Sequence, residues 1–379
     1  MNMEKSLQVK DGNTIPVISF FTGGGFLDMG FEKAGFNIVW TNEFNTSYSD
    51  FYSFGMTAWR KASSSSKAEA KITSTKSINQ IYGPGIIKEA FKGEKPSLFG
   101  SIGGPPCTDF SSGGKHNGSN GKNGKLTRIY VNRICSIMPS FFVLENVPGL
   151  YRTKKHRHFL NSLMKKLESG DYCLDVNILN SLDFGLPQDR ERFFMVGIKR
   201  NIVKECLGRI VREKERNWFS WPEPKYKNAK QTYPWPDVVN NGAKPTKPSS
   251  IPTELMVHSL FNKNNDPAKI PNGKDCFNAY SKKFGIIKEG DTHRKSFKRL
   301  HRYKFSPTAC YGHNEVHLHP WKKRRLSVRE AMRIQGIPDT YILPEEAPLS
   351  TKFELVSNGV PVPLSYEIAK SLMAFLDDK

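Results

Sequence analysis

The sequence contains no apolar run long enough to cross a membrane. Such a run needs about 20 residues, and this 379-residue chain, 37% of it hydrophobic, interrupts its apolar stretches well before that length. The N-terminus, residues 1–11, is polar and mixed in charge, so it lacks the apolar core of a secretion signal. We therefore expect a cytoplasmic protein that does not bind membranes.

Cysteine is also scarce: the chain has six, far apart and without a C-x-x-C pair. This spacing argues against a zinc ribbon and against a disulfide framework. Each cysteine is then either a small core residue or a reactive thiol, and the core interpretation is the default for five of them. The six are Cys107, Cys135, Cys173, Cys206, Cys276 and Cys310.

Acidic residues are too few to balance the basic ones. The 57 Lys and Arg stand against 36 Asp and Glu, which gives a formal net charge of +21. Such an excess attracts polyanions and favours nucleic-acid binding. The alternative is a basic soluble protein without such a partner, because charge by itself names no chemistry. At roughly 150 residues per domain, the length predicts two domains, or one large and one small.

What the sequence does contain begins with an alternation of strands and helices. Residues 15–21 form a short apolar run, three glycines follow at 23–25, and helical spacing continues over 26–34. A second apolar run, 36–40, leads to Glu43. This strand–turn–helix–strand unit predicts an α/β fold with a parallel sheet. Further expected strands are 97–102, 140–144 and 193–198, and further expected helices are 126–138, 156–167, 327–335 and 364–376.

The composition changes at about Arg200. Prolines crowd residues 221–252, Asn and Lys dominate residues 262–274, and regular alternation returns only at Leu326. Such a composition is typical of surface loops. We expect a separate, irregular domain here that contributes little to a shared core.

The glycine turn and Glu43 suggest a site for an adenosine-containing cofactor. Glycines between a strand and a helix let the backbone approach a ligand at the helix N-terminus. An acidic residue about 20 residues further on, at the end of the next strand, can bind the two hydroxyls of a ribose. NAD, FAD and S-adenosylmethionine all fit this pattern, and so does a purely structural turn.

Three further clusters adjoin expected strands. In Gly103 to Cys107, two prolines stiffen the backbone just before a thiol, which suits a positioned nucleophile; the alternative is a buried cysteine after a turn. Glu145 follows a strand and is a candidate general acid or hydrogen-bond partner for a base; the alternative is a capping or salt-bridged carboxylate. Arg190 and Arg192 either aim two guanidinium groups into a pocket or belong to a solvated edge.

Taken together, these residues resemble the family of DNA cytosine-5 methyltransferases, in the family's order and at compatible spacing. The resemblance covers most of the chain except about 202–319, where the family has its variable target-recognition region. The matching motifs are Phe21 to Gly25, Pro105-Pro106-Cys107, Glu145-Asn146-Val147, Gln188-x-Arg190-x-Arg192, Arg325 to Pro338, and Asn358 to Leu364.

The family implies a Rossmann-like S-adenosylmethionine-dependent methyltransferase domain, with a mixed, mostly parallel sheet and helices on both faces, plus a smaller irregular target-recognition domain. We expect residues 1–201 to form the first part of the catalytic domain and 202–319 the target-recognition domain. Residues 320–379 would return to the cofactor pocket. The implied reaction transfers a methyl group from S-adenosylmethionine to carbon 5 of a flipped-out cytosine in a specific duplex sequence, within a restriction–modification system. We expect a monomer that binds double-stranded DNA and no metal.

The resemblance also assigns roles to single residues. Cys107 is implied to be the nucleophile that attacks carbon 6 of cytosine. Glu145 would hydrogen-bond the ring nitrogen and exocyclic amine, and Arg192 would hold the oxygen at carbon 2. Arg190 would support the pocket. The implied cofactor-binding residues are Phe21, Gly23, Gly25, Glu43, Phe44, Pro105, Asn358 and Val360.

The chain departs from the family pattern in three places. Phe26 stands where many members have a third glycine. Ser77 stands where the family often has an Asp that contacts adenine, so the adenine contact stays open. Thr108-Asp109 replaces the commoner Gln-Gly after the cysteine, which we interpret as tolerated variation.

The segment 202–319 is expected to bind the duplex. Its basic residues suit phosphate contacts, which position DNA without specifying a sequence. They include Arg294, Lys295, Lys298, Arg299 and Arg302.

A short stretch with one cysteine and three histidines deserves separate consideration as a metal site. Its spacing does not match a standard zinc finger, and no second cluster completes it. We interpret these residues as polar groups of a DNA-facing loop. They are Cys310, His313, His317 and His319.

Three alternatives to the DNA methyltransferase hypothesis remain at this point. The same chemistry acts on RNA in one of them, because the motifs do not specify the nucleic acid. An NAD-dependent oxidoreductase would account for the glycine turn and Glu43, but not for the Pro-Pro-Cys motif or the arginine pair. A non-catalytic binding protein would not need Cys107, Glu145 and Arg192 together.

Overall fold

The computed structural model describes residues 14–63, 69–106, 122–261, 266–311 and 315–377. A six-stranded sheet forms its centre, in the order β2-β1-β3-β4-β7-β5. The first four of these strands run parallel, whereas β7 is antiparallel to both of its neighbours. The predicted mixed, mostly parallel sheet is therefore confirmed. In sheet order, the strands span Asn37–Asn42 (β2), Pro16–Phe20 (β1), Gly100–Gly103 (β3), Phe141–Asn146 (β4), Glu191–Lys199 (β7) and Tyr172–Asn180 (β5).

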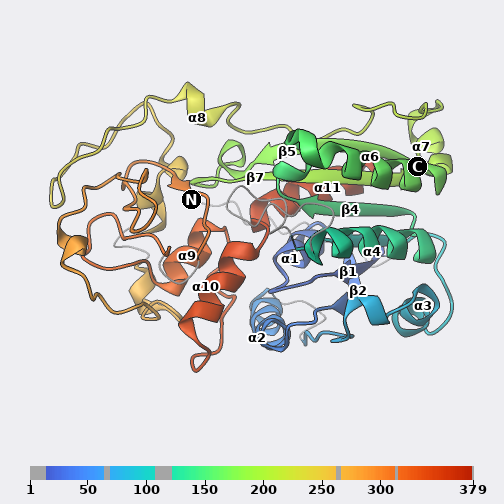
Figure 1. Cartoon of the computed structure of the whole chain (residues 1–379), viewed down its shortest axis with the longest axis horizontal. Helices are drawn as coiled ribbons and strands as arrows, with labels where there is room; N and C mark the ends of the chain where they lie inside the picture. Colours follow the sequence, from blue (N-terminus) through green and yellow to red (C-terminus); the bar gives the residue numbers. More distant parts are fainter. Residues whose placement is uncertain (1–13, 64–68, 107–121, 262–265, 312–314, 378–379) are drawn as a thin grey trace.

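Helices cover both faces of the sheet, as expected (Figure 1). Neighbouring strand residues point to opposite faces, so Val17 and Val143 belong to one buried cluster while Ile18 and Leu144 belong to the other. Because both faces are buried, β1 and β4 are mainly apolar and do not alternate with polar residues. The first cluster lies against α1 (Phe26–Lys33), α7 (Arg200–Leu207) and α11 (Val362–Asp377), and the second against α3 (Gly83–Phe91), α4 (Lys122–Ile137) and α6 (Lys154–Ser169).

The C-terminal segment returns to the N-terminal part of the sheet. Helix α11 packs against α1, and the Ser365 hydroxyl donates a hydrogen bond of 2.7 Å to the carbonyl of Leu27. Gly30 lies directly against Ser365, where any side chain on residue 30 would collide. The N-terminal helix α1 and the C-terminal helix α11 therefore belong to one packed unit.

The strands and helices expected from the sequence all occur, with ends shifted by a few residues. Others were not expected: strand β5 and the helices α2 (Thr46–Ala62), α3, α5 (Gly149–Arg152), α7 and α10 (Leu349–Asn358). Strand β5 lacks a clean apolar pattern because it carries Asp175, which is buried. That carboxylate accepts the backbone N–H groups of Trp218 and Phe219 at 2.8 and 3.0 Å.

The chain between α7 and α9 (Val328–Ile334) is irregular, and much of it lies to the left in Figure 1. Its regular pieces include α8 (Ala229–Thr232) and the two-residue strand β8 (Ser306–Pro307), which pairs with β6 (Gln188–Asp189). No described helix is long and apolar enough to span a membrane.

The expectation that this irregular part contributes little to a shared core is wrong. Trp218 and Phe219 pack against Phe375 of α11, each with ring centroids 5.8 Å apart. Val257 and Leu300 belong to the same buried cluster as residues of α1, α2, α9 and α10. Large apolar side chains spaced without a helical or strand period still bury their surface, which a composition argument does not detect.

Candidate active site at the carboxyl ends of the strands

The glycine turn after β1 adopts backbone angles that favour glycine. Phe21, Gly23 and Gly25 have φ of 53°, 56° and 80°. At Gly25, a side chain would also meet Tyr52 at 2.8 Å, so glycine is required there twice over. The N–H of Thr22 donates to the carbonyl of Asn42 at 3.1 Å, which ties the turn to the end of β2.

Glu43, just past the end of β2, points back at this turn. Its carboxylate accepts the N–H of Gly23 at 2.9 Å and the N–H of Asn45 at 2.8 Å. Burial raises the pKa of Glu43, and these backbone hydrogen bonds act against the rise. Phe44 beside it is 69% exposed, so its ring is accessible from solvent. Asn42 also holds the following segment in place, because its Nδ2 donates to the carbonyl of Lys76, the residue before Ser77, at 2.9 Å.

The C-terminal motif reaches the same edge of the sheet. Asn358 ends α10, and its Nδ2 lies 3.5 Å from the hydroxyl of Tyr48 on α2. Val360 is 7% exposed and belongs to the core cluster of α1 and α11. Phe26, the departure from the family pattern, fills the space against Gly359, where a side chain would collide with its ring. The bulkier residue therefore packs between the glycine turn and the C-terminal motif.

The ends of β3 and β4 lie side by side. The Nδ2 of Asn146 donates to the carbonyl of Pro105 at 3.2 Å, which fastens the Pro-Pro turn to β4. Gly104 sits so close to Glu145 that a Cβ there would lie 2.7 Å from Oε2 of the carboxylate. Pro105 is buried in this turn. Cys107, the expected nucleophile, follows Pro106 directly and lies outside the described residues.

Glu145 and Arg192 form an ion pair across neighbouring strands. The Nε of Arg192 on β7 lies 3.0 Å from Oε1 of Glu145 on β4, and the two residues are 8% and 9% exposed. Burial raises the pKa of the Glu145 carboxyl, while Arg192 and Arg190 lower it. The site therefore contains a carboxylate with an increased proton affinity, and this carboxylate holds the guanidinium group of Arg192 in place.

Arg190 does not share this position, so neither alternative considered for the arginine pair, two guanidinium groups in one pocket or a solvated edge, applies to it. It is fully buried, and it donates to the carbonyls of Ala309 at 3.0 Å, Ser357 at 2.6 Å and Gly359 at 3.0 Å. It therefore connects the sheet, the irregular part and the C-terminal motif. This agrees with a supporting role, exerted through packing and not through contact with a substrate.

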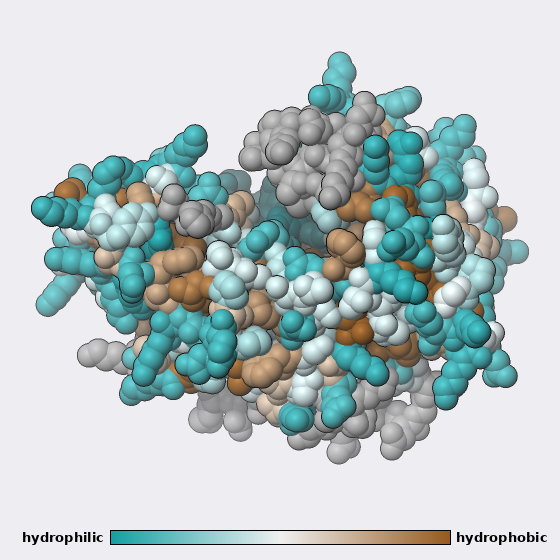
Figure 2. Space-filling model, turned by 60° about the horizontal axis from the view of Figure 1, so that its bottom comes forward, coloured by the Kyte–Doolittle hydropathy of each residue, from teal (hydrophilic) through white to brown (hydrophobic). Residues whose placement is uncertain are grey.

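A cleft of about 1320 Å³ lies between the sheet edge and the irregular part. Arg192 and Asn358 line it from one side and Lys230, Lys298 and Cys310 from the other. Figure 2 shows the surface hollowed between the part that contains the central sheet and the irregular part. Among the residues that the structure describes, the lining contains five cations and five carboxylates, so these residues give the cleft no excess of positive charge. The cations are Arg152, Arg192, Lys230, Lys295 and Lys298, and the carboxylates Asp183, Asp189, Glu191, Glu315 and Glu354.

The basic residues expected to contact phosphates separate into two groups. Lys295 and Lys298 line the cleft, and Arg294 is exposed. Arg302 is half-buried and pairs with the buried Glu289 at 2.8 Å. Arg299 is fully buried and donates to the carbonyls of Phe284, Ile287, His319 and Lys322, so its expected role in DNA contact is wrong. An irregular chain leaves backbone carbonyls that no neighbouring strand or helical turn pairs with, and Arg299 donates hydrogen bonds to four of them.

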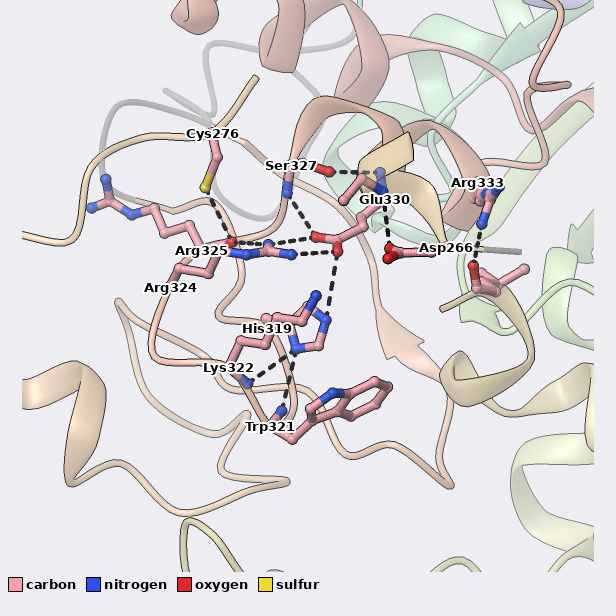
Figure 3. Close-up of polar contacts among 12 residues, drawn as sticks. Asp266, Cys276, His319, Trp321, Lys322, Arg324, Arg325, Ser327, Glu330 and Arg333 are labelled. Carbon is pink, nitrogen blue, oxygen red and sulfur yellow. Dashed lines mark hydrogen bonds and ion pairs between the residues drawn. The ribbon is translucent and has the colours of Figure 1, made fainter. Parts of the chain in front are cut away.

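The two described histidines of the Cys/His stretch are also buried. This overturns the assignment of His319 to a DNA-facing loop, whereas His317 lines the cleft. Burial lowers the pKa of His317 to about 3 and that of His319 well below its ordinary value. In Figure 3, His319 Nδ1 accepts the N–H groups of Trp321 and Lys322, and its Nε2 lies 3.5 Å from Glu330. Cys310 is exposed in the cleft, and His313 lies outside the described residues. No cluster of three or more potential metal ligands occurs in the described ranges.

Glu330 is the centre of this polar cluster (Figure 3). It forms a capping box with Ser327 at the start of α9 and accepts Arg324 at 2.6 and 2.7 Å. The motif from Arg325 to Pro338 therefore anchors α9 against the irregular part. Sequence analysis recognised the motif but not this role, since no local pattern shows that His319 and Glu330 meet.

Comparison with known proteins agrees with this geometry. The family model for C-5 cytosine-specific DNA methylases matches residues 15–374. The chain is 37% identical to the type II methyltransferase M.NmeDI of Neisseria meningitidis serogroup C, over 100% of this chain and 87% of the relative. It is 30% identical to the type II methyltransferase M.FnuDI of Fusobacterium nucleatum, over 96% and 95%. The fold is similar to that of the S. pombe Dnmt2 methyltransferase, with a TM-score of 0.55 at 14% identity, covering 96% of this chain and 99% of the other.

Proposed function

Because the chain belongs to the C-5 cytosine-specific DNA methylase family and so methylates carbon 5 of cytosine in DNA, we propose that it works through a covalent adduct between Cys107 and a flipped-out cytosine. The observation that supports this most is the Glu145–Arg192 pair, with its 3.0 Å contact, beside the Pro-Pro turn that precedes Cys107. The family membership also argues against the oxidoreductase and the non-catalytic alternatives.

The nucleophile acts on carbon 6 of the ring. The Cys107 thiolate forms a carbon–sulfur bond there, and the electron pair of the 5,6 double bond makes carbon 5 nucleophilic. Carbon 5 then accepts the methyl group. Loss of the carbon 5 proton to a base or water restores the double bond as the thiolate leaves.

Glu145 and Arg192 hold the ring during these steps. The increased proton affinity of Glu145 suits a carboxyl that hydrogen-bonds the ring nitrogen and the exocyclic amine and stabilises the adduct. Arg192, fixed by that carboxylate, donates to the oxygen at carbon 2. The buried position of both groups strengthens these interactions, because water does not screen them.

The family implies S-adenosylmethionine as methyl donor, and the residues at the glycine turn fit it. When bound, it supplies an electrophilic methyl on a sulfonium centre. Gly23 and Gly25 have no side chains, so the backbone of the turn can approach the cofactor closely. Glu43 offers a carboxylate for the ribose hydroxyls, and the exposed ring of Phe44 is available to adenine. Phe21, Pro105, Asn358 and Val360 complete the proposed pocket from β1, β3 and the C-terminal motif.

DNA recognition is assigned to residues 202–319, between catalytic parts 1–201 and 320–379. The segment forms the wall of the cleft opposite the sheet edge and supplies Lys230, Lys295 and Lys298 to it. Since the chain matches type II methyltransferases over its whole length, we further propose that it is a monomeric modification enzyme of a restriction–modification system, acting on double-stranded DNA.

Labelled S-adenosylmethionine tests this function. The protein is incubated with plasmid DNA, with duplex RNA, and with neither, and the product is sequenced for 5-methylcytosine. We expect methylated cytosines in one short DNA sequence and none in RNA. Exchanging residues 202–319 for those of a relative with another target should change that sequence; an active chimera with the parent's target would refute the assignment of recognition to this segment.

A further inference from the structure

Helix α6 carries a cluster of exposed positive charge outside the cleft. Its inward face is apolar, with Phe159, Leu160, Leu163 and Leu167 buried against the sheet. Packing therefore requires only that the outward face be polar, and acids would serve as well as bases. The exposed positions nevertheless contain five cations and no carboxylate. In order along the helix they are Lys154, Lys155, Arg157, His158, Asn161, Ser162, Lys165, Lys166 and Ser169.

Five of these side chains, Lys154, Lys155, Arg157, Lys165 and Lys166, are here named the α6 basic face. Within the described residues, no ion pair joins Lys154, Arg157 or Lys165 to a carboxylate. Arg157 instead lies over the ring of Tyr151, 4.4 Å from its centroid, and Lys166 donates to the amide oxygen of Asn132 at 2.7 Å. The acid of the helix, Glu168, is buried and pairs with Arg216.

The start of the helix is electrostatically unfavourable. The N-terminus of a helix carries a partial positive charge and favours acids, by about 0.3–1 kcal/mol for each. Helix α6 has no acid in its first turn and no side-chain cap, and it begins with two lysines. Local rules are broken in this way mainly at functional sites. An anion beside the first turn would offset the repulsion.

The basic face is continuous with the cleft. Gly149, Arg152 and Thr153, which lead into α6, line the cleft, and α6 then runs away from it. Tyr151, on which Arg157 rests, stacks on Phe193 with ring centroids 5.6 Å apart, and Phe193 adjoins Arg192. The 16 residues of α6 extend about 24 Å, which corresponds to roughly seven base pairs of duplex.

We infer that the α6 basic face is a second contact surface for the DNA backbone, which holds the duplex on one side of the target site. The inference rests on the proposed function in that a duplex occupies the cleft. Exposed lysines aligned with a duplex release counterions from its phosphates, so the contact adds affinity and salt dependence without adding sequence specificity.

Duplexes of two lengths test the inference. Lys154 and Lys165 lie eleven residues apart, three turns along one stripe of the helix. Lys154→Gln/Lys165→Gln is compared with wild type on 12-bp and 32-bp duplexes centred on the methylated sequence. On the 32-bp duplex we expect binding to weaken roughly tenfold and the slope of log K against log salt to become shallower by about 2. Binding of the 12-bp duplex should weaken much less, because that duplex reaches only the start of α6, next to the cleft-lining Thr153.

Two further variants serve as controls. Lys204→Gln/Lys370→Gln removes the same charge from exposed positions of α7 and α11, on the other face of the sheet, and should bind both duplexes like wild type. Lys154→Arg/Lys165→Arg keeps the charge and should also retain full binding, and melting temperatures check that each variant is folded. The inference is overturned if Lys154→Gln/Lys165→Gln binds the 32-bp duplex like wild type or loses the same affinity for both duplexes. It is also overturned if Lys204→Gln/Lys370→Gln loses as much affinity as Lys154→Gln/Lys165→Gln. Absence of methylation by the wild type would instead refute the proposed function.

Discussion

Arg192 at the sheet edge and Arg299 in the irregular part are both shielded from solvent, 8% and 0% exposed, but they have different partners. Arg192 faces the cleft and pairs with the carboxylate of Glu145. Arg299 donates to backbone carbonyls of four residues of its own surroundings. The sheet satisfies its backbone through strand pairing, so its side chains are available for chemistry, whereas the irregular chain needs side chains to satisfy its backbone.

The largest effect is expected at the sheet edge. Cys107→Ala should reduce methyl transfer by at least about 10⁴-fold, because the covalent route is lost. DNA binding and melting temperature should stay close to those of the wild type. Single-turnover methylation and a duplex-binding titration measure the two properties. Methylation near the wild-type rate would refute the covalent mechanism.

Glu145→Gln should follow, with a rate lower by roughly 10²- to 10⁴-fold, the range of a lost proton-transfer group. Glutamine retains the shape and can still form hydrogen bonds, but it has no negative charge to pair with Arg192 and no proton to transfer to the base. The variant should bind S-adenosylmethionine normally, as calorimetry can show. Rates that differ from wild type only through weaker cofactor binding would contradict the assigned role.

A pair of neighbouring residues sharpens the comparison within the irregular part. Arg299→Met leaves several buried carbonyls without a donor and should cost roughly 3 kcal/mol of unfolding free energy. Lys298→Gln, next to it in the chain and lining the cleft, should leave stability unchanged and weaken DNA binding in a salt-dependent manner. Urea unfolding and binding titrations are made on both. If Lys298→Gln is the destabilised variant, the division between structural and DNA-facing cations is wrong.

The smallest effect is expected at the cofactor turn. Glu43→Ala should weaken S-adenosylmethionine binding by about 1.5–3 kcal/mol, the contribution of a hydrogen bond to a charged group. Calorimetry measures it directly. Glu43→Gln should restore part of the affinity, because its amide oxygen still accepts one hydrogen bond. Unchanged affinity in the alanine variant would remove Glu43 from the site.

Sequence analysis was most successful where a structure is set by its own local pattern. The unit from β1 through the glycine turn to β2 was predicted from local signals. Apolar residues show the strands and the helix by their spacing, and glycines mark the turn because φ above zero favours glycine. Strand β5 escaped notice because buried Asp175 interrupts its apolar pattern, and its partners at 218 and 219 are distant in the sequence.

By itself, the sequence determined the family, the order of the sheet-edge motifs and the residue types available for chemistry, because each motif is a short run of contiguous residues. Tertiary structure alone decided which charges face the cleft. Arg192 meets Glu145 across 47 residues, Arg190 joins Ala309 to the C-terminal motif, and Arg299 is buried while Lys298 beside it lines the cleft. The physical reason is that a charged side chain loses its hydration on burial and must find a partner, and that folding brings this partner from a distant part of the sequence. A local pattern of residue types does not show which partner that is.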